Sequence, residues 1–117
     1  MLVLFDNGTP RSLAVYLIER HTVTEARARG WEELTNGDLL NAAEATGFEV
    51  LVTTDRNLRY QQNLRDRKIA IVVLGLGRWS LLKPHVPRVV DAADEARAGS
   101  FCEVTIPLPP KEPFQRR

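Results

Sequence analysis

Residues 36–55 read NGDLLNAAEATGFEVLVTTD, and this stretch decides how the chain is organised. The pattern predicts a loop, a helix, a turn and a buried strand. Asp38 precedes a run of leucines and alanines, and an acid favours a helix start because it accepts backbone N–H groups and faces the positive end of the helix dipole. Gly47 is expected to end the helix, since glycine readily adopts positive φ. Residues 50–52 are apolar and β-branched, which favours a strand that Asp55 then follows.

Strands and helices are expected to alternate along the rest of the chain. Apolar runs predict buried strands, and threonines around Val23 favour another. Alternating strands and helices form a mostly parallel sheet with helices on both faces, so we expect a three-layer α/β/α fold around a sheet of about five strands. The expected strands are 2–5, 21–25, 50–52, 69–74 and 101–106, and the expected helices are 10–20, 38–46, 56–68 and 84–98, with 27–35 unassigned.

Composition places the chain among ordinary globular proteins. Its 117 residues, 44% hydrophobic and 26% charged, suit one domain over 1–106, followed by a proline-rich loose tail over 107–117. The net charge of +1 gives no global basic field, so any nucleic-acid contact would come from a local patch. Cys102 is the single cysteine, which excludes an internal disulfide and favours the reducing cytoplasm. Asp6 cuts the first apolar run far short of a signal or membrane segment, so no membrane partner is expected.

Three carboxylates are expected at one edge of the sheet. Asp6 ends the first strand, Asp38 opens a helix and Asp55 follows the third strand. Ligands of open α/β sheets collect beyond the carboxyl ends of the strands. Clustered carboxylates repel one another unless a cation neutralises them, and Mg²⁺ and Mn²⁺ prefer oxygen ligands. Each acid alone has the plainer role of a helix cap, so the metal hypothesis depends on the three together.

These residues resemble the PIN-domain nucleases. In that family an acid opens an alanine-rich helix and the next strand ends in Thr-x-Asp, as Asp38, Thr53 and Asp55 do here, while Asp6 ends the first strand. The short chain and its early loop at residues 6–10 look like the compact PIN-like proteins that are often regarded as toxins of toxin–antitoxin pairs. The resemblance covers residues 2–75.

The resemblance implies Mg²⁺- or Mn²⁺-dependent cleavage of RNA. Asp6, Asp38 and Asp55 would be the metal ligands and catalytic residues, and Thr53 would support the site through its hydroxyl group. An antitoxin is the implied protein partner, and exposed aromatic residues in the second half of the chain make a homodimer the alternative.

Three departures from the family pattern keep a second interpretation open. Asn7 and Asn57 stand where relatives commonly carry acids, although their amide oxygens are still able to support a metal site. A further family acid has no clear counterpart, and the nearby candidates are Glu25, Glu32 and Glu33. A catalytically degenerate PIN-like module that binds RNA or a protein is therefore the alternative to an enzyme.

A nuclease also needs cations beside its acids to hold phosphates. Arg56 and Arg59 follow Asp55 and are the candidates for RNA binding. The later cations up to residue 68 are expected on a solvated helix face, and Trp31 and Trp79 in the core or at an interface.

Two other classes of α/β protein fit less well. A receiver-type signalling domain needs paired acids near the first strand and a lysine after the last, whereas Asp6 stands alone and Lys83 precedes a helix. A nucleotide-binding Rossmann domain needs a glycine-rich phosphate loop, which the sequence at residues 6–10 does not provide.

Overall fold

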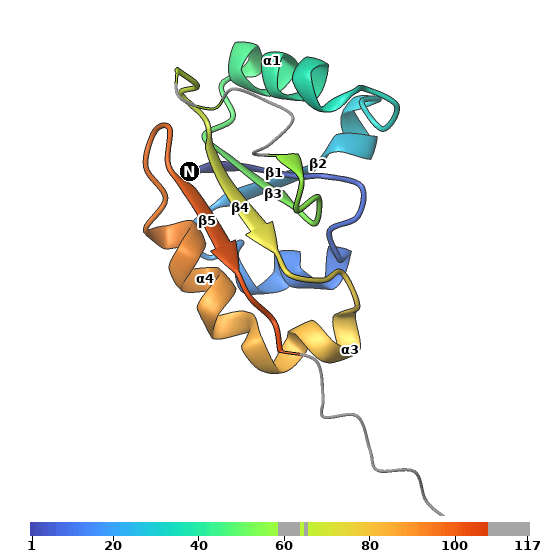
Figure 1. Cartoon of the computed structure of the whole chain (residues 1–117), viewed down its shortest axis with the longest axis vertical. Helices are drawn as coiled ribbons and strands as arrows, with labels where there is room; N and C mark the ends of the chain where they lie inside the picture. Colours follow the sequence, from blue (N-terminus) through green and yellow to red (C-terminus); the bar gives the residue numbers. More distant parts are fainter. Residues whose placement is uncertain (59–63, 65, 108–117) are drawn as a thin grey trace, which may run out of the picture.

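A computed structural model describes residues 1–58, 64 and 66–107 of the chain. The strands of this part pair in parallel and form one sheet with the order β2-β1-β3-β4-β5 (Figure 1). They are β1 (Leu2–Phe5), β2 (Thr22–Glu25), β3 (Val50–Thr53), β4 (Ala70–Leu74) and β5 (Phe101–Val104).

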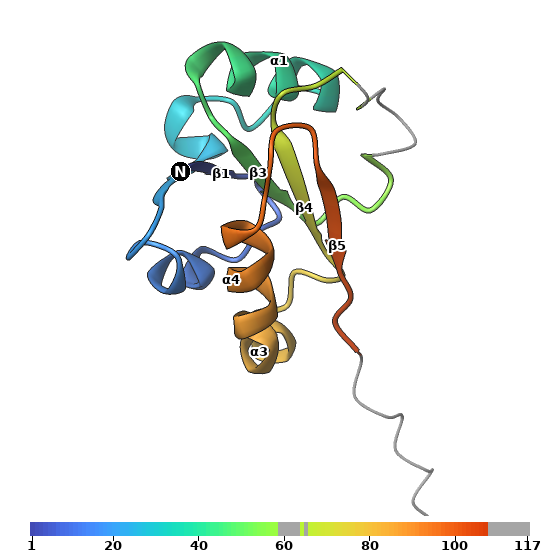
Figure 2. The same cartoon turned by 90° about the vertical axis from the view of Figure 1, so that its left-hand side faces the viewer.

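Helices cover both faces of this sheet (Figures 1 and 2). Side chains alternate along each strand, so Val3 and Phe5 of β1 belong to the core on one face and Leu4 to the core on the other. The arrangement confirms the expected three-layer α/β/α fold with five strands. The first face carries η1 (Arg11–Tyr16), α3 (Trp79–Leu82), η3 (Lys83–His85) and α4 (Val86–Asp94), and the second carries η2 (Ala26–Arg29) and α1 (Asn36–Thr46).

The strand order reverses between β1 and β3. The chain first adds β2 on one side of β1 and later adds β3 on the other side. In doubly wound sheets such a reversal leaves a crevice beyond the carboxyl ends of the two strands, and ligands bind there. Asp6 directly follows β1, and Asp55 lies two residues beyond β3, so both acids lie at this reversal. The same strand order serves folds with different functions, so function has to be argued from the side chains.

The start of α1 differs from the sequence prediction. Thr35 is its N-cap, and the threonine hydroxyl accepts the backbone N–H of Asp38 at 3.4 Å. Asp38 therefore lies in the first turn rather than at the cap, because a threonine three residues earlier takes the capping position. Gly47 ends the helix with a φ of 98°, as expected.

Two of the expected helices are shorter than the sequence suggested. Residues 10–20 contain only the 3₁₀ helix η1, where branched and aromatic side chains such as Val15 and Tyr16 favour the α-helix weakly. The last helix ends at Asp94 rather than at residue 98, and Gly99 turns the chain into β5 with a φ of 78°. Much of the helix expected over 56–68, and residues 108–117 of the expected tail, lie outside the described residues.

Candidate functional site

Asp6 and Asp55 are joined through one hydroxyl group. Thr53, the last residue of β3, is only 1% exposed. Its Oγ1 donates to Asp6 Oδ2 at 2.8 Å and accepts the backbone N–H of Asp55 at 3.1 Å. The backbone N–H of Asp6 donates to the carbonyl of Val52 at 2.9 Å, which extends the pairing of β1 and β3 to the start of the loop. The sheet therefore fixes the relative positions of the two acids.

Neutral donors hold the other oxygens of both carboxylates. The backbone N–H of Asn7 donates to Asp6 Oδ1 at 2.8 Å, and that of Asn57 donates to Asp55 Oδ1 at 3.0 Å. The side-chain amide of Asn36 donates to Asp55 Oδ2 at 2.7 Å. Each carboxylate oxygen has two acceptor positions, so these bonds leave capacity for a further partner. No lysine, arginine or histidine in the described ranges forms an ion pair with Asp6 or Asp55.

The structure does not bring Asp38 into this hydrogen-bonded group. Asp38 is exposed in the first turn of α1, and Asn36, two residues earlier, makes the contact to Asp55 instead. Among the residues that the structure describes, no three Asp, Glu, His or Cys side chains lie close enough together to hold a metal ion. Sequence reasoning missed Asn36, although the spacing of Thr35 and Asp38 was a signal for a capping threonine that starts the helix at residue 36.

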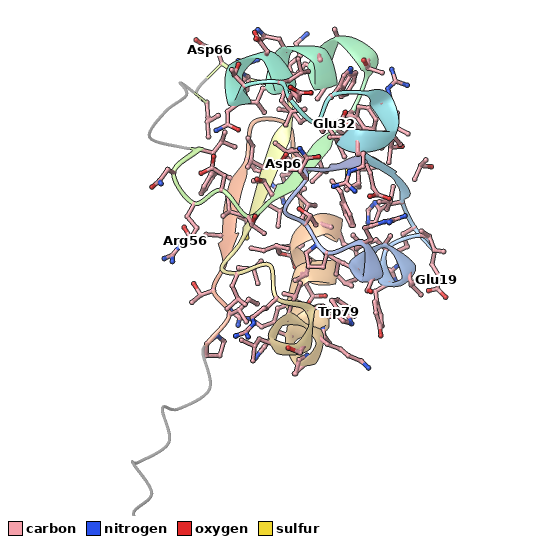
Figure 3. All side chains as sticks on the ribbon, turned by 90° about the vertical axis from the view of Figure 1, so that its right-hand side faces the viewer. Asp6, Glu19, Glu32, Arg56, Asp66 and Trp79 are labelled. Carbon is pink, nitrogen blue, oxygen red and sulfur yellow. The ribbon has the colours of Figure 1, made fainter. Side chains whose placement is uncertain are left out.

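Glu25 is the acid that the fold brings beside Asp6. It ends β2 in register with Phe5, and it lines a cavity of about 30 Å³ together with Asp6. Its carboxylate lies 3.2 Å from Arg11 Nε, so its charge already has a partner. The backbone carbonyl of Glu32 accepts a hydrogen bond from the side-chain amide of Asn7 at 2.7 Å. Figure 3 shows Glu32 near Asp6.

Close backbone packing frames the site. A Cβ atom on Gly8 would collide with Thr54 Oγ1, and one on Gly77 would lie 2.8 Å from the carbonyl oxygen of Gly8. The Thr9 hydroxyl donates to the carbonyl of Val52 at 2.8 Å and is itself buried. The loops after β1, β3 and β4 therefore pack closely, and at Gly77 a Cβ atom would clash with the backbone of Gly8.

The arginine expected to bind RNA next to Asp55 is occupied elsewhere. Arg56 Nε lies 3.5 Å from a carboxylate oxygen of Glu103 on β5, and Figure 3 shows its side chain well away from Asp6. Arg59, the second candidate, lies outside the described residues.

A cavity of about 390 Å³ lies at the opposite edge of the sheet, beside the amino ends of the strands. Its charged lining includes Glu44, which accepts hydrogen bonds from Arg67 and from the backbone N–H groups of Lys68 and Ile69. Burial opposes ionisation of this carboxyl, but these hydrogen bonds outweigh burial and lower the pKa of Glu44. The carboxylate is thus engaged in joining α1 to β4, and we place the candidate site at Asp6 and Asp55 instead.

Comparisons with protein-family models, curated proteins and solved structures find no match to this chain. The resemblance to PIN-domain nucleases therefore stays a prediction from the sequence. None of the helices in the described residues is long and apolar enough to cross a bilayer.

Proposed function

We propose that the chain is a PIN-like, metal-dependent endoribonuclease that acts on RNA in the cytoplasm, with a toxin role and an antitoxin partner as the biological setting. The observation that carries this proposal is the link from Asp6 through the Thr53 hydroxyl to Asp55 at the reversal of the strand order. Two acids at this edge, with neutral donors on their oxygens and no paired cation among the described residues, form an anionic site that attracts a cation.

The carboxylate oxygens of this site are suitable ligands for a hard divalent cation. Mg²⁺ is commonly bound by one or two carboxylates, with waters and substrate phosphate oxygens completing its coordination. Asp6 and Asp55 would hold the ion, and Asp38, which the structure leaves outside this hydrogen-bonded group, is tested as a third ligand by the substitution below. When bound, Mg²⁺ or Mn²⁺ would activate a water for attack on a phosphodiester and neutralise developing charge.

Other residues of the chain orient the two acids. Thr53 directs one carboxylate oxygen of Asp6, and Asn36 and Asn57 each direct one oxygen of Asp55. Such outer hydrogen bonds fix the orientation of metal-binding carboxylates and commonly tune their affinity.

Cleavage of a mixed RNA pool tests the proposal. Purified protein is incubated with Mn²⁺, with Mg²⁺ and with EDTA, beside the Asp6→Asn, Asp38→Asn and Asp55→Asn variants. Asp91→Asn is the matched control, because it makes the same change on an exposed residue of α4. We expect metal-dependent cutting that Asp6→Asn and Asp55→Asn abolish and the control retains. Folded wild-type protein that neither cuts RNA nor binds metal would overturn the proposal.

A degenerate PIN-like module that binds RNA or a protein without cutting is the second candidate. The absence of a three-acid group among the described residues favours it, as do the neutral Asn7 and Asn57. Metal binding without RNA cleavage would identify this case.

The strand order also occurs in receiver domains. Residues 105–107, which follow β5, contain no lysine of the kind that those domains need after the last strand.

A further inference from the structure

A short basic segment lies against the loop that carries Asp6. The segment runs from η2 to Glu32, and both of its ends lie near that loop. At its start, Arg27 lines the same small cavity as Asp6. At its end, the Glu32 carbonyl accepts the side-chain amide of Asn7 at 2.7 Å. Sequence reasoning did not find this neighbour, because it depends on the pairing of β2 with β1.

The two arginines of this segment carry charge that no described acid neutralises. Arg27 and Arg29 are exposed, and neither forms an ion pair within the described ranges. Arg11 and Arg56, by contrast, are paired with Glu25 and with Glu103 of β5. Arg27, which lines the same cavity as Asp6, and Arg29, two residues later, therefore supply unpaired positive charge on η2.

Trp31 contacts Arg29 through the face of its ring. The guanidinium carbon lies 4.9 Å from the centre of the indole ring, within the range of a cation–π contact. The ring in turn packs edge-on against Phe48, which is buried, at a centroid distance of 6.1 Å. Gly30, with a φ of 76°, makes the turn that brings the tryptophan back beneath the arginine. This contact favours one orientation of the guanidinium in the free protein, which would lower the entropic cost of binding a ligand.

We propose that Arg27 and Arg29, positioned by Trp31, bind the phosphate backbone of single-stranded RNA and direct it toward Asp6, an inference that rests on the proposed function. Guanidinium groups suit this role because their planar set of donors matches two oxygens of one phosphate. Backbone contacts of this kind position a strand without reading its sequence.

Fluorescence anisotropy with a labelled single-stranded oligouridine tests the surface. EDTA is present throughout, so binding is measured without cleavage, and the salt concentration is varied. The test protein is Arg27→Gln/Arg29→Gln. The control is Lys83→Gln/Arg97→Gln, which removes the same charge from two exposed residues outside the segment.

The arginine variant should bind RNA at least tenfold more weakly than wild type at low salt. The slope of log K against log salt should fall by about 0.7 for each arginine that contacts a phosphate. The control should stay within about twofold of wild type, since charges distant from the bound strand are screened. An equal loss in the control, or no loss in the arginine variant, would overturn the proposal.

The role of Trp31 is tested by a double-mutant cycle. Trp31→Leu should weaken RNA binding in the wild-type background but have no further effect once Arg29→Gln is present, because the tryptophan acts through the arginine. Equal losses in both backgrounds would show a general structural effect and overturn the positioning role. Circular dichroism confirms that each variant is folded.

Two further comparisons separate the possible failures. Wild-type cleavage that depends on Asp6, combined with unchanged binding by the arginine variant, would reject the surface and leave the nuclease in place. If the arginine variant loses RNA binding and the wild-type protein does not cut RNA, the surface would be supported and the nuclease rejected. Tighter binding of an oligodeoxyuridine than of the RNA oligonucleotide would overturn RNA as the ligand.

Discussion

The Nε2 atom of His21 lies 2.7 Å from a carboxylate oxygen of Asp94. This contact links the residue just before β2 to the last residue of α4. The second oxygen of Asp94 accepts a hydrogen bond from Arg20 at 2.9 Å. The hydrogen bond from His21, and then the charges of Arg20 and His21, outweigh burial and lower the pKa of Asp94 below its usual value. This contact fixes an outer strand to the helix that packs beneath the sheet.

Replacing Asp94 should make stability depend less on pH. Because the pKa of Asp94 is lowered in the folded protein, its contribution is fully present above the unfolded value of about 3.8 and is lost as the pH falls through the folded value. We expect Asp94→Asn to reduce the free energy of unfolding at neutral pH by about 1–2 kcal/mol, with the difference closing below about pH 4. Urea denaturation across pH 3–7 measures it. Asp91→Asn, on the same helix, is the control, and a difference that does not change with pH would contradict the expectation.

Glu44 should be more important for stability than an ordinary surface glutamate. Its carboxylate accepts hydrogen bonds from Arg67 and from the backbone N–H groups of Lys68 and Ile69. We expect Glu44→Ala to lower the free energy of unfolding by about 2 kcal/mol, since it removes a charged acceptor from partly buried donors. Glu95→Ala is the control on an exposed residue, and equal midpoints for the two variants in urea would refute the expectation.

Thr53 offers a test of how the two acids are coordinated. Thr53→Val keeps the shape of the side chain but removes the hydroxyl that links Asp6 and Asp55. We expect a loss of about 10–100-fold in Mn²⁺ affinity and in RNA cleavage, as is common when a group orienting a metal ligand is removed. Thr53→Ser restores the hydroxyl and should restore most of both. Metal affinity that survives in the valine variant would show that the link has no role in binding.

Asn36→Asp should destabilise the metal-free protein and increase the stabilisation that Mn²⁺ provides. The change puts a third carboxylate where an amide now donates to Asp55 at 2.7 Å, and the like charges repel. In EDTA we expect a lower midpoint of urea unfolding than wild type, by about 1 kcal/mol in free energy. Mn²⁺ should then raise the midpoint more than it does for wild type, because a ligand that binds the folded state stabilises it.

Ala98→Asp is the control for this experiment, since it adds the same charge to an exposed position that lines the opposite cavity. A larger response to Mn²⁺ in the control than in Asn36→Asp would place the cation elsewhere on the protein.

Local signals predicted the elements that depend on local chemistry. Gly47 ends α1 as expected, and the apolar run before residue 75 forms β4. The neighbourhood of Asp6 and Asp55 also follows from the alternation of strands and helices, because carboxyl ends of parallel strands share one edge. The features that local signals missed depend on competition between nearby residues for one role, or on contacts between residues far apart in the sequence. Thr35 displaced Asp38 as the helix cap, and Arg56 found an acid on β5 that no local pattern connects with it.

The link between Asp6 and Thr53 spans 47 positions of the chain, and this has a consequence for synthesis on the ribosome. The first strand, β1, is made early, but its second neighbour, β3, is made only after β2 and α1. Contacts this distant in sequence form late, since a long loop must close before they contribute. A nascent chain shorter than about half the protein therefore has no assembled site. If the protein cuts RNA, the ribosome translating it and its own messenger are spared until the domain has emerged.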